Sequence, residues 1–368
     1  IARGAIHVIA QGSNPSGCGY GSRIWPRHCN PLCCCVVVCS GGSTAFALDI
    51  WGNKLASIFR NYPYDIHFCA NRSHGSSPDG CKAPETVVWG VFAHRGSQYG
   101  EYCSMGLAAM QRRGWIIFSH NSAIGDWVEH VQPYAAQIIS DPKNIAAWLR
   151  HGGTWFAGVN ILPNDRLGRL EGGPALAGPA INFITGLHGK LALDYAQISV
   201  MYPGYPAYDG SESEAAHRYR EIRCAAHVDG LRPDGPDRRR YIYEPHQFVL
   251  GIPLVQTSEQ ASPMVVWEGS HHIIREAFRS VLNKVPVADW GTTDLTDVYH
   301  AARKDCFERC PRVTVWAQPG QCYLLHRLSL HGILPWGCDA IAPEIGRMVA
   351  YFRPENDGNL DNWLNGNY

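Results

Sequence analysis

A histidine and an aspartate two residues apart, His227 and Asp229, are the first candidates for chemistry in this sequence. In an extended segment, residues i and i+2 point to the same face, so this spacing places an imidazole beside a carboxylate while Val228 turns away. Another histidine, His331, follows a turn and an apolar strand much later in the chain. Two histidines and one carboxylate on one face of an octahedral ion leave open positions, an arrangement typical of Fe(II) oxygenases. The pattern therefore predicts an iron site formed by His227, Asp229 and His331.

An arginine, Arg347, opens the next apolar strand after His331. A planar guanidinium can hold the far carboxylate of a ligand such as 2-oxoglutarate through two hydrogen bonds, although an arginine at this place, taken alone, is more often an ordinary surface residue at a strand end. Arg353 is the alternative. The two arginines share one face of an ideal strand and stand about 20 Å apart along it, so only one is expected to reach a ligand on the iron. Because Arg353 precedes Pro354, we expect it to lie at the rim away from the iron.

Other histidines are weaker candidates for the distal ligand. His326 lies inside the apolar strand before His331. The glycine and the Pro-Trp turn that follow His331 favour His331 over His326. His271 follows Ser270, a residue suited to capping a helix, and is interpreted as structural or as a neighbour of the ligands.

Taken in order, these motifs resemble the phytanoyl-CoA dioxygenase family. The family pattern is His-x-Asp, a Gly-Ser-His turn that closes a strand, a glycine before an apolar strand that ends in His-Gly, and a later arginine. Residues 105–354 contain these features as His227-Val-Asp229, Gly269-Ser270-His271, Gly320 with His331-Gly332, and Arg347. A longer insertion than is usual in the family separates His331 from Arg347. Arg353 therefore stays a second candidate for binding the carboxylate of 2-oxoglutarate.

The resemblance implies an Fe(II)- and 2-oxoglutarate-dependent dioxygenase. Such an enzyme hydroxylates a small-molecule substrate with O2 and releases succinate and CO2, with ascorbate as a supporting reductant. The iron ligands would be His227, Asp229 and His331, and Arg347 would bind 2-oxoglutarate. The alternative is a non-catalytic jelly-roll protein that binds a metal or a small ligand. The joint presence of the carboxylate and the arginine favours the enzyme, because a binding module has no need to hold 2-oxoglutarate.

Short strands with Gly and Pro turns must position these residues. Alternation of apolar side chains predicts strands, and a 3.6-residue period predicts helices. The expected strands are 191–202, 248–256, 264–267, 312–316, 321–326 and 347–353. The expected helices are 124–139, kinked or split at Pro133, then 143–151, 271–282 and 295–309. This order predicts a mainly β fold with flanking helices, a double-stranded β-helix of the jelly-roll, cupin-like kind.

The segment 1–104 differs from the rest of the chain. It shows no sustained period and holds nine of the 14 cysteines: Cys18, Cys29, Cys33, Cys34, Cys35, Cys39, Cys69, Cys81 and Cys103. We interpret 1–104 as non-native upstream sequence or a disordered Cys-rich extension, with a native start at Met105 or Met110. The oxygenase domain is then expected at 105–368.

The composition restricts the partners. Lys plus Arg and Asp plus Glu both number 32, so no net field draws the chain to nucleic acid or to an anionic membrane. The longest apolar run near the start is far short of the ~20 residues that cross a bilayer, and no signal peptide is recognisable. We therefore expect a cytoplasmic protein with a small-molecule substrate and neither a nucleic-acid nor a membrane partner. The sequence does not predict an oligomeric state.

Overall fold

The computed structural model describes two units of the chain, 1–99 and 100–368. The described residues are 35–38, 45–48, 67–73, 86–92, 98–189, 192–356 and 358–366, with side chains from Gly106 onward. In the first unit, β1 (Cys35–Val38) pairs with β2 (Ala45–Leu48), and β3 (His67–Ser73) pairs with β4 (Thr86–Phe92), both antiparallel. Most of 1–104 lies outside the described residues, so the interpretation of this segment as upstream or disordered sequence stays a prediction.

The larger sheet of the second unit has seven strands in the order β5-β14-β11-β16-β8-β7-β6. Its neighbours are all antiparallel. The strands are β5 (Trp115–Phe118), β6 (Leu149–Arg150), β7 (Trp155–Gly158), β8 (Gln197–Met201), β11 (Phe248–Pro253), β14 (Cys322–His326) and β16 (Arg347–Phe352).

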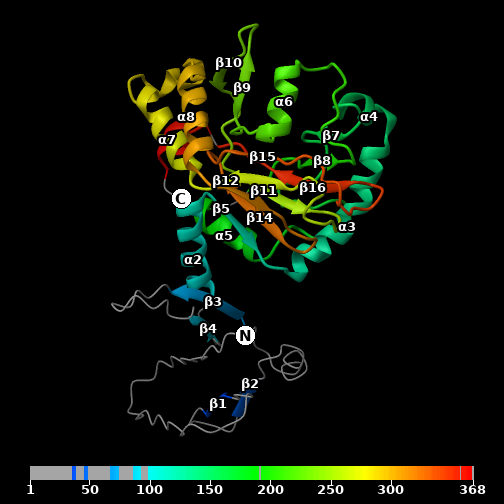
Figure 1. Ribbon diagram of the computed structural model, residues 1–368, viewed down its shortest axis with the longest axis vertical. Helices are drawn as coiled ribbons and strands as arrows, with labels where there is room; N and C mark the ends of the chain where they lie inside the picture. The colour runs from blue at the N-terminus through cyan, green and yellow to red at the C-terminus, as the bar shows by residue number, and fades with distance from the viewer. Residues whose placement is uncertain are drawn as a thin grey trace, which may run out of the picture. The chain divides into compact units, whose positions relative to one another are not determined.

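The smaller sheet has the order β13-β12-β15, and an antiparallel bridge between His227 and His331 extends it at β15. Its strands are β12 (Met264–Trp267), β13 (Arg312–Val315) and β15 (His331–Ile333). From β8 to β16 the chain passes back and forth between the two sheets (Figure 1). The segment around His227, which lies between β8 and β11 in the sequence, joins the smaller sheet through its bridge to His331. This alternation is the topology of a double-stranded β-helix, so the predicted fold is confirmed.

Nine helices and one further hairpin complete the part of the chain that the structure describes. The helices are α2 (Gln98–Arg113), α3 (Ser122–Ser140), α4 (Pro142–Trp148), α5 (Pro179–His188), α6 (Glu214–Arg223), α7 (Ser270–Leu282), the 3-10 helix η1 (Val287–Thr292), α8 (Thr296–Arg309) and α9 (Leu360–Asn365). The hairpin pairs β9 (Leu231–Asp234) with β10 (Arg239–Ile242) directly after Asp229. None of the helices in the described residues is long and apolar enough to span a bilayer.

Three apolar clusters hold the domain together, and alternation along β16 explains two of them. Met348, Ala350 and Phe352 face outward and pack with α3 and α5. Val349 and Tyr351 face inward, into the space between the sheets, where they meet Met264 of the smaller sheet and others. The outer face of the smaller sheet packs against α7, α8 and α9. Helices thus cover both sheets, and the inner faces remain for a site.

Most expected elements are present, with local differences. β12 has the predicted bounds. Pro133 lies inside one continuous helix, α3. A proline removes the hydrogen bond to the carbonyl four residues earlier, here that of the exposed Glu129, which water can solvate. The helix expected at 143–151 ends at Trp148, because Leu149 and Arg150 pair with β7 instead.

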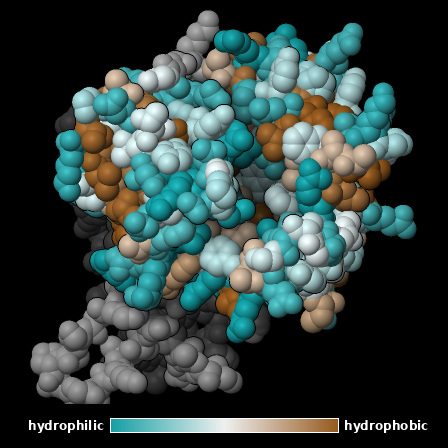
Figure 2. Space-filling model, turned by 90° about the horizontal axis from the view of Figure 1, so that it is seen from above, coloured by the Kyte–Doolittle hydropathy of each residue, from teal (hydrophilic) through white to brown (hydrophobic). Residues whose placement is uncertain are grey.

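Seen from above, the visible face of the molecule is mainly hydrophilic (Figure 2). Hydrophobic side chains gather in smaller areas toward the left and right margins of that view. Scattered exposed apolar side chains are normal for a folded domain.

Candidate metal centre

His227, Asp229 and His331 come together where the segment before β9 meets β15. One potential ligand atom from each residue lies within 4.8 Å of the others. Oδ1 of Asp229 is 3.1 Å from Nε2 of His227 and 3.8 Å from Nε2 of His331. The side chains of Asp229 and His331 are buried, whereas that of His227 is 51% exposed, so the cluster is open to solvent on the His227 side. The structure thus brings the three predicted ligands into one small cluster.

Both imidazole rings are oriented by backbone carbonyls. Nδ1 of His227 lies 2.9 Å from the carbonyl oxygen of Ala225, and Nδ1 of His331 lies 2.9 Å from that of Ser329. A carbonyl only accepts, so each Nδ1 carries a proton and Nε2 is the nitrogen of each ring whose lone pair a metal would bind. Those lone pairs are directed to the same place as Oδ1 of Asp229. Fixing one ring nitrogen so that the other can bind metal is the usual arrangement of metal-binding histidines, and the donor set fits a divalent transition metal.

The protonation states also suit metal binding. Burial raises the pKa of Asp229, but the hydrogen bond from His227 and the charges of His331 and Arg353 outweigh it and hold the pKa well below its usual range. Burial lowers the pKa of His331 to about 4, against the charge of Asp229. At neutral pH the carboxylate is therefore ionised and His331 is neutral, which are the states that ligate metals. Burial lowers the pKa of His227, but its hydrogen bond to Asp229 outweighs burial and raises the pKa, so a metal would displace a proton from Nε2 of His227.

Two consecutive left-handed residues precede the cluster. Cys224 has a φ of 56° and Ala225 a φ of 49°. Non-glycine residues avoid this conformation, and its cost is roughly 1 kcal/mol or more per residue. The turn places the carbonyl of Ala225 against Nδ1 of His227. Local backbone strain here accompanies the orientation of a candidate ligand.

The segment that carries His227 and Asp229 has a neighbouring strand on one side only. His227 exchanges two backbone hydrogen bonds with His331, so the carbonyl of Ala226 and the N–H of Val228 point to the opposite edge. Two tyrosines satisfy them: the hydroxyl of Tyr219 in α6 donates to the Ala226 carbonyl at 2.7 Å, and the Val228 N–H donates to the hydroxyl of Tyr299 in α8 at 3.1 Å. Side chains thus replace a missing strand beside the two candidate ligands.

One arginine supports both of these tyrosines. The guanidinium carbon of Arg303 lies 4.9 Å from the centre of the Tyr219 ring and 5.3 Å from that of Tyr299. A cation over an aromatic face is attracted by the ring. α6 and α8 are therefore linked at the point where they hold the ligand segment, a contact that the sequence analysis did not anticipate.

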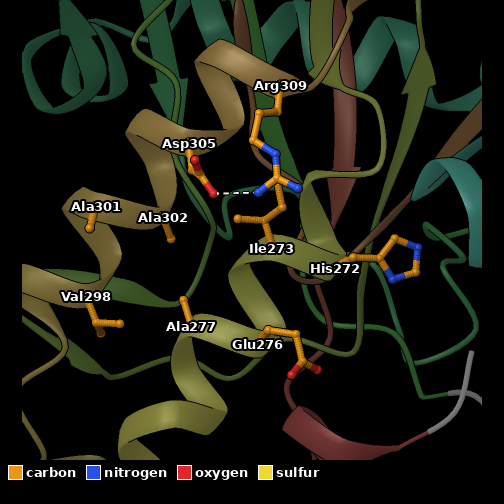
Figure 3. Close-up of a pocket in the computed structure, with 9 residues that line it drawn as sticks. All are labelled: His272, Ile273, Glu276, Ala277, Val298, Ala301, Ala302, Asp305 and Arg309. Atoms are coloured by element: carbon orange, nitrogen blue, oxygen red, sulfur yellow. Dashed lines mark hydrogen bonds and ion pairs between the residues drawn. The ribbon is translucent and has the colours of Figure 1, made fainter.

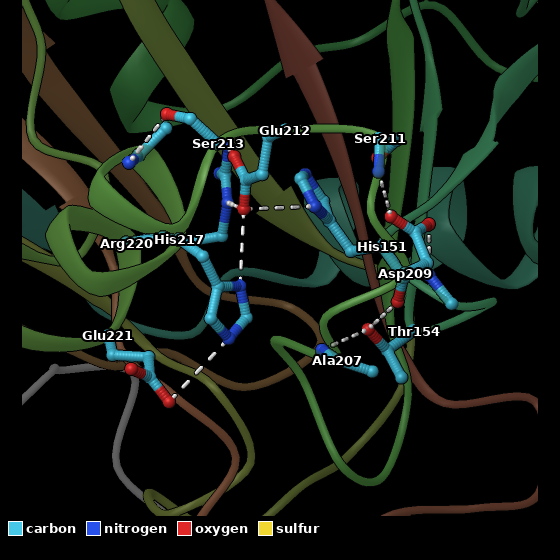
Figure 4. Close-up of polar contacts among 12 residues, drawn as sticks. His151, Thr154, Ala207, Asp209, Ser211, Glu212, Ser213, His217, Arg220 and Glu221 are labelled. Carbon is cyan, nitrogen blue, oxygen red and sulfur yellow. Dashed lines mark hydrogen bonds and ion pairs between the residues drawn. The ribbon is translucent and has the colours of Figure 1, made fainter.

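A polar network anchors α6 on its other side (Figure 4). Glu212 accepts hydrogen bonds from Nε and NH2 of Arg220, at 3.2 and 3.0 Å, and one of its oxygens lies 3.2 Å from Nδ1 of His217 and 3.5 Å from Nδ1 of His151. His151 belongs to the turn between β6 and β7. The network therefore fastens the start of α6 to the larger sheet, and so helps to position the residues that follow α6.

Arg353 contacts the cluster directly. Its NH1 lies 3.7 Å from Oδ2 of Asp229, the oxygen that does not face the histidines, and its backbone N–H donates to Asp194 at 3.0 Å. The expectation that Arg353 lies away from the iron ligands is therefore wrong. The side chain faces inward like that of Tyr351, two residues earlier, and its length brings the guanidinium to Asp229.

Arg347 occupies a different environment between the sheets. Its residue is only 6% exposed, and its guanidinium lies beside the hydroxyls of Tyr323 and Tyr351, which hydrogen-bond to each other at 2.8 Å. Tyr351 is four residues further along β16, so both side chains lie on the same, inward face of the strand. The Arg347 side chain extends along this face and meets Tyr351 between the sheets. NH1 is buried without a hydrogen-bond partner, and no acidic side chain among the described residues forms an ion pair with Arg347. A buried charge in this state is costly unless a ligand compensates it.

The remaining histidine candidates are occupied by other contacts. Nδ1 of His326 accepts the Leu328 N–H at 3.0 Å, and Nε2 lies 2.8 Å from NH2 of Arg275. Both ring nitrogens are therefore in contact with other groups of the protein, and His326 is not free to ligate a metal. The ring of His271 is tilted by 39° against that of His326, with 4.8 Å between the ring centres, and its Nε2 lies 2.9 Å from the Gln111 carbonyl oxygen. Ser270 does not cap α7; its hydroxyl accepts the Leu330 N–H instead.

Two cavities differ in their relation to the cluster. One of about 650 Å³ lies between α7 and α8, with a floor of Ile273, Ala277, Val298, Ala301 and Ala302 and an Asp305–Arg309 ion pair at its edge (Figure 3). None of the candidate ligands lines it. The other, of about 330 Å³, is lined by Arg353, so it adjoins Asp229. The smaller cavity thus shares Arg353 with the candidate metal centre, although none of the three candidate ligands lines it.

Comparison with known proteins gives weak likenesses. No family model matches the chain, and no curated protein matches it. Among solved structures, it is similar to SnoK, a non-heme alpha ketoglutarate dependent carbocyclase from nogalamycin biosynthesis, with 13% identity over 71% of this chain and 88% of that chain and a TM-score of 0.38. EctD from S. alaskensis with bound Fe has 16% identity over 68% and 76%, with a TM-score of 0.35. A Pseudomonas putida prolyl-4-hydroxylase has 10% identity over 69% and 99%, with a TM-score of 0.33. A function for this chain must therefore rest on its own residues.

Proposed function

We propose that this chain is an Fe(II)- and 2-oxoglutarate-dependent dioxygenase that hydroxylates a small molecule. In the overall reaction, one oxygen atom of O2 replaces the hydrogen of a C–H bond as a hydroxyl group. The other enters succinate as 2-oxoglutarate loses CO2. His227, Asp229 and His331 would hold Fe(II), and Arg347 would bind the distal carboxylate of 2-oxoglutarate.

The observation that carries this proposal is the buried guanidinium of Arg347, which has tyrosine hydroxyls beside it but no ion-pair partner among the described residues, in a barrel that also holds the His-Asp-His cluster. A metal-binding protein without a cosubstrate gains nothing from burying such a charge. A dicarboxylic acid that chelates a metal through one end presents its second carboxylate at a distance from the ion, where a planar guanidinium binds it best. The pair of features therefore favours an enzyme over a module that only binds a metal or small ligand.

The chain's own residues prepare the site in defined ways. The backbone carbonyls of Ala225 and Ser329 keep both Nε2 atoms available, and Arg353 holds the second oxygen of Asp229. Tyr323 and Tyr351, beside Arg347, belong to an apolar cluster drawn from both sheets, which would exclude water from a ligand bound there. Fe(II), when bound, supplies the redox chemistry that couples decarboxylation of 2-oxoglutarate to oxidation of a C–H bond.

The test is succinate formation from 2-oxoglutarate by the full chain with Fe(II), ascorbate and O2. We expect succinate above the level of the protein-free mixture, even without the primary substrate, and its loss in Asp229→Ala. The matched control is Asp305→Ala, which removes a surface carboxylate paired with Arg309 and leaves the reaction unchanged. Tight binding of Fe(II) and 2-oxoglutarate without any succinate, across a broad set of candidate substrates, would favour a binding protein instead.

A further inference from the structure

The cavity of about 330 Å³ beside Arg353 has a polar floor and a charged rim. Its floor includes the buried His246, with Asp194 and Arg353, and its rim carries Arg166, Glu244 and Glu355. Cavities of roughly 300–1,000 Å³ with a few convergent polar groups are typical of small-molecule sites. The cavity is therefore large enough for a small molecule up to the size of an amino acid.

Two side chains on the floor have polar atoms without partners. His246 is 6% exposed, and neither of its ring nitrogens makes a hydrogen bond of good geometry; the polar groups beside them are the backbone of Arg353 and Oε2 of Glu244, which is 3.7 Å from Nε2. Nε of Arg353 is also buried without a partner. Leaving such groups unsatisfied costs about 1–3 kcal/mol each. In either protonation state the imidazole offers at least one N–H donor, so the floor presents donors to an acceptor that enters the cavity.

The charges around the cavity have both signs. Asp194, Glu244 and Glu355 are acidic, and Arg166 and Arg353 are basic. A simple anion on the floor would face three carboxylates, and a simple cation would face two guanidinium groups. A molecule that carries both charges, a short distance apart, satisfies the donors on the floor and the carboxylates at the rim.

We propose that this cavity binds a small zwitterion, with its carboxylate against His246 and Nε of Arg353 and its ammonium group toward Glu244 and Glu355. NH1 of the same Arg353 lies 3.7 Å from Oδ2 of Asp229, so the ligand shares a side chain with the candidate metal centre. The assignment of this zwitterion as the molecule to be hydroxylated rests on the proposed function. The binding itself does not.

The test is calorimetric titration of the metal-free full chain with the twenty free amino acids. Each one that binds is then compared with its methyl ester, which is a cation, and its N-acetyl derivative, which is an anion. We expect at least one free amino acid to bind, and both of its derivatives to bind at least ten-fold more weakly. Equal binding of the N-acetyl derivative, or of the ester, would overturn the two-charge assignment, and no binding by any free amino acid would overturn the site.

Substitutions locate the site within the chain. His246→Leu keeps a similar volume but removes both ring nitrogens, and should weaken binding at least ten-fold. Glu244→Gln changes only a rim charge on a partly exposed side chain, leaves folding intact, and should weaken binding several-fold. His300→Leu, on the exposed side of α8, is the matched control and should bind like the unaltered chain. Unchanged binding in both His246→Leu and Glu244→Gln would overturn the proposal. Succinate formation is measured separately, so a failed zwitterion site and a failed oxygenase remain distinguishable.

Discussion

The two arginines at opposite ends of β16 have the same side-chain chemistry and face the same side of the strand, but their surroundings differ. Arg353 has its charge balanced, because NH1 lies 3.7 Å from Asp229. Arg347 has only tyrosine hydroxyls beside it and no acidic partner among the described residues. A buried charge that is already paired can position its partner, whereas an unpaired one is prepared for a ligand. We therefore assign Arg353 to the orientation of Asp229 and Arg347 to the binding of 2-oxoglutarate.

The largest effect should come from Arg347→Ala. Removing one partner of a desolvated charge pair costs roughly 2–5 kcal/mol, and each 1.4 kcal/mol is about ten-fold in affinity. We expect 2-oxoglutarate binding to the Fe(II)-loaded chain to weaken some thirty-fold or more, with Fe(II) affinity nearly unchanged. Titration of each ligand by calorimetry under anaerobic conditions measures both. A ranking in which Arg353→Ala loses more 2-oxoglutarate affinity than Arg347→Ala would reverse the assignment.

Asp194 accepts the backbone N–H of Arg353, and the pH dependence of protein stability tests whether its ionised carboxylate stabilises the fold. Burial raises the pKa of Asp194 to about 6 from its usual 3.8, although hydrogen bonds and the charge of Arg353 act in the opposite direction. The folded chain therefore binds a proton between about pH 6 and 4 where the unfolded chain does not, so the Asp194 contribution to stability falls as pH rises through this window. Asp194→Asn removes the charge and keeps an acceptor for the Arg353 N–H. At pH 8 we expect it to be more stable than the unaltered chain by roughly 2 kcal/mol.

This difference should shrink toward zero near pH 4. Urea unfolding of both chains at pH 8 and pH 4 measures it. A variant that is less stable at pH 8 would show that the ionised carboxylate is a net stabilising partner of Arg353, contrary to the burial argument.

Arg353→Ala should act on the metal rather than on the cosubstrate. Loss of a group that orients a metal ligand typically lowers metal affinity about 10- to 100-fold. We expect a loss near the lower end for Fe(II), because both histidines keep their own carbonyl contacts. With Fe(II) saturating, 2-oxoglutarate affinity should change less than about three-fold. An unchanged Fe(II) affinity would show that the 3.7 Å contact with Asp229 does not position the carboxylate.

The smallest expected effect concerns the turn before His227, whose backbone carbonyl orients that candidate ligand. Ala225 has a φ of 49°, which glycine adopts without strain. Ala225→Gly should therefore stabilise the fold by up to about 1 kcal/mol. Because glycine also permits other conformations, we expect no gain in Fe(II) affinity. Denaturant unfolding and metal titration of the variant test the two parts, and a clear loss of stability would argue against strain at this turn.

The sequence predicted what depends on local pattern. Alternating apolar residues located β12 and β16, and the His-x-Asp spacing placed His227 and Asp229 on one face. The helix α6 was missed because Glu214–Arg223 is mainly polar and has no fully buried side chain, so it carries no continuous apolar stripe. β15 has only three residues, too few for a period to be read.

The contacts that a sequence does not encode locally were missed or wrongly placed. Arg353 reaches Asp229 because its side chain is long. The sequence analysis considered only the distance along the strand, and so placed Arg353 away from the iron ligands. Tyr219 and Tyr299 resemble ordinary core residues of their helices, and only the fold shows that their hydroxyls meet the edge of the ligand segment. His246 gave no motif signal at all; its orphaned ring nitrogens become visible only with the cavity in place.

The most direct test of the metal centre is an anaerobic titration of the Fe(II)-loaded chain with 2-oxoglutarate, monitored by visible absorption. Chelation of Fe(II) by a 2-oxo acid produces a charge-transfer band that neither component shows alone. We predict the band for the unaltered chain and for His326→Ala, whose ring nitrogens are engaged elsewhere, and its absence in His331→Ala. A band that survives His331→Ala and disappears in His326→Ala, or that never forms in the unaltered chain, would contradict an iron centre built from His227, Asp229 and His331.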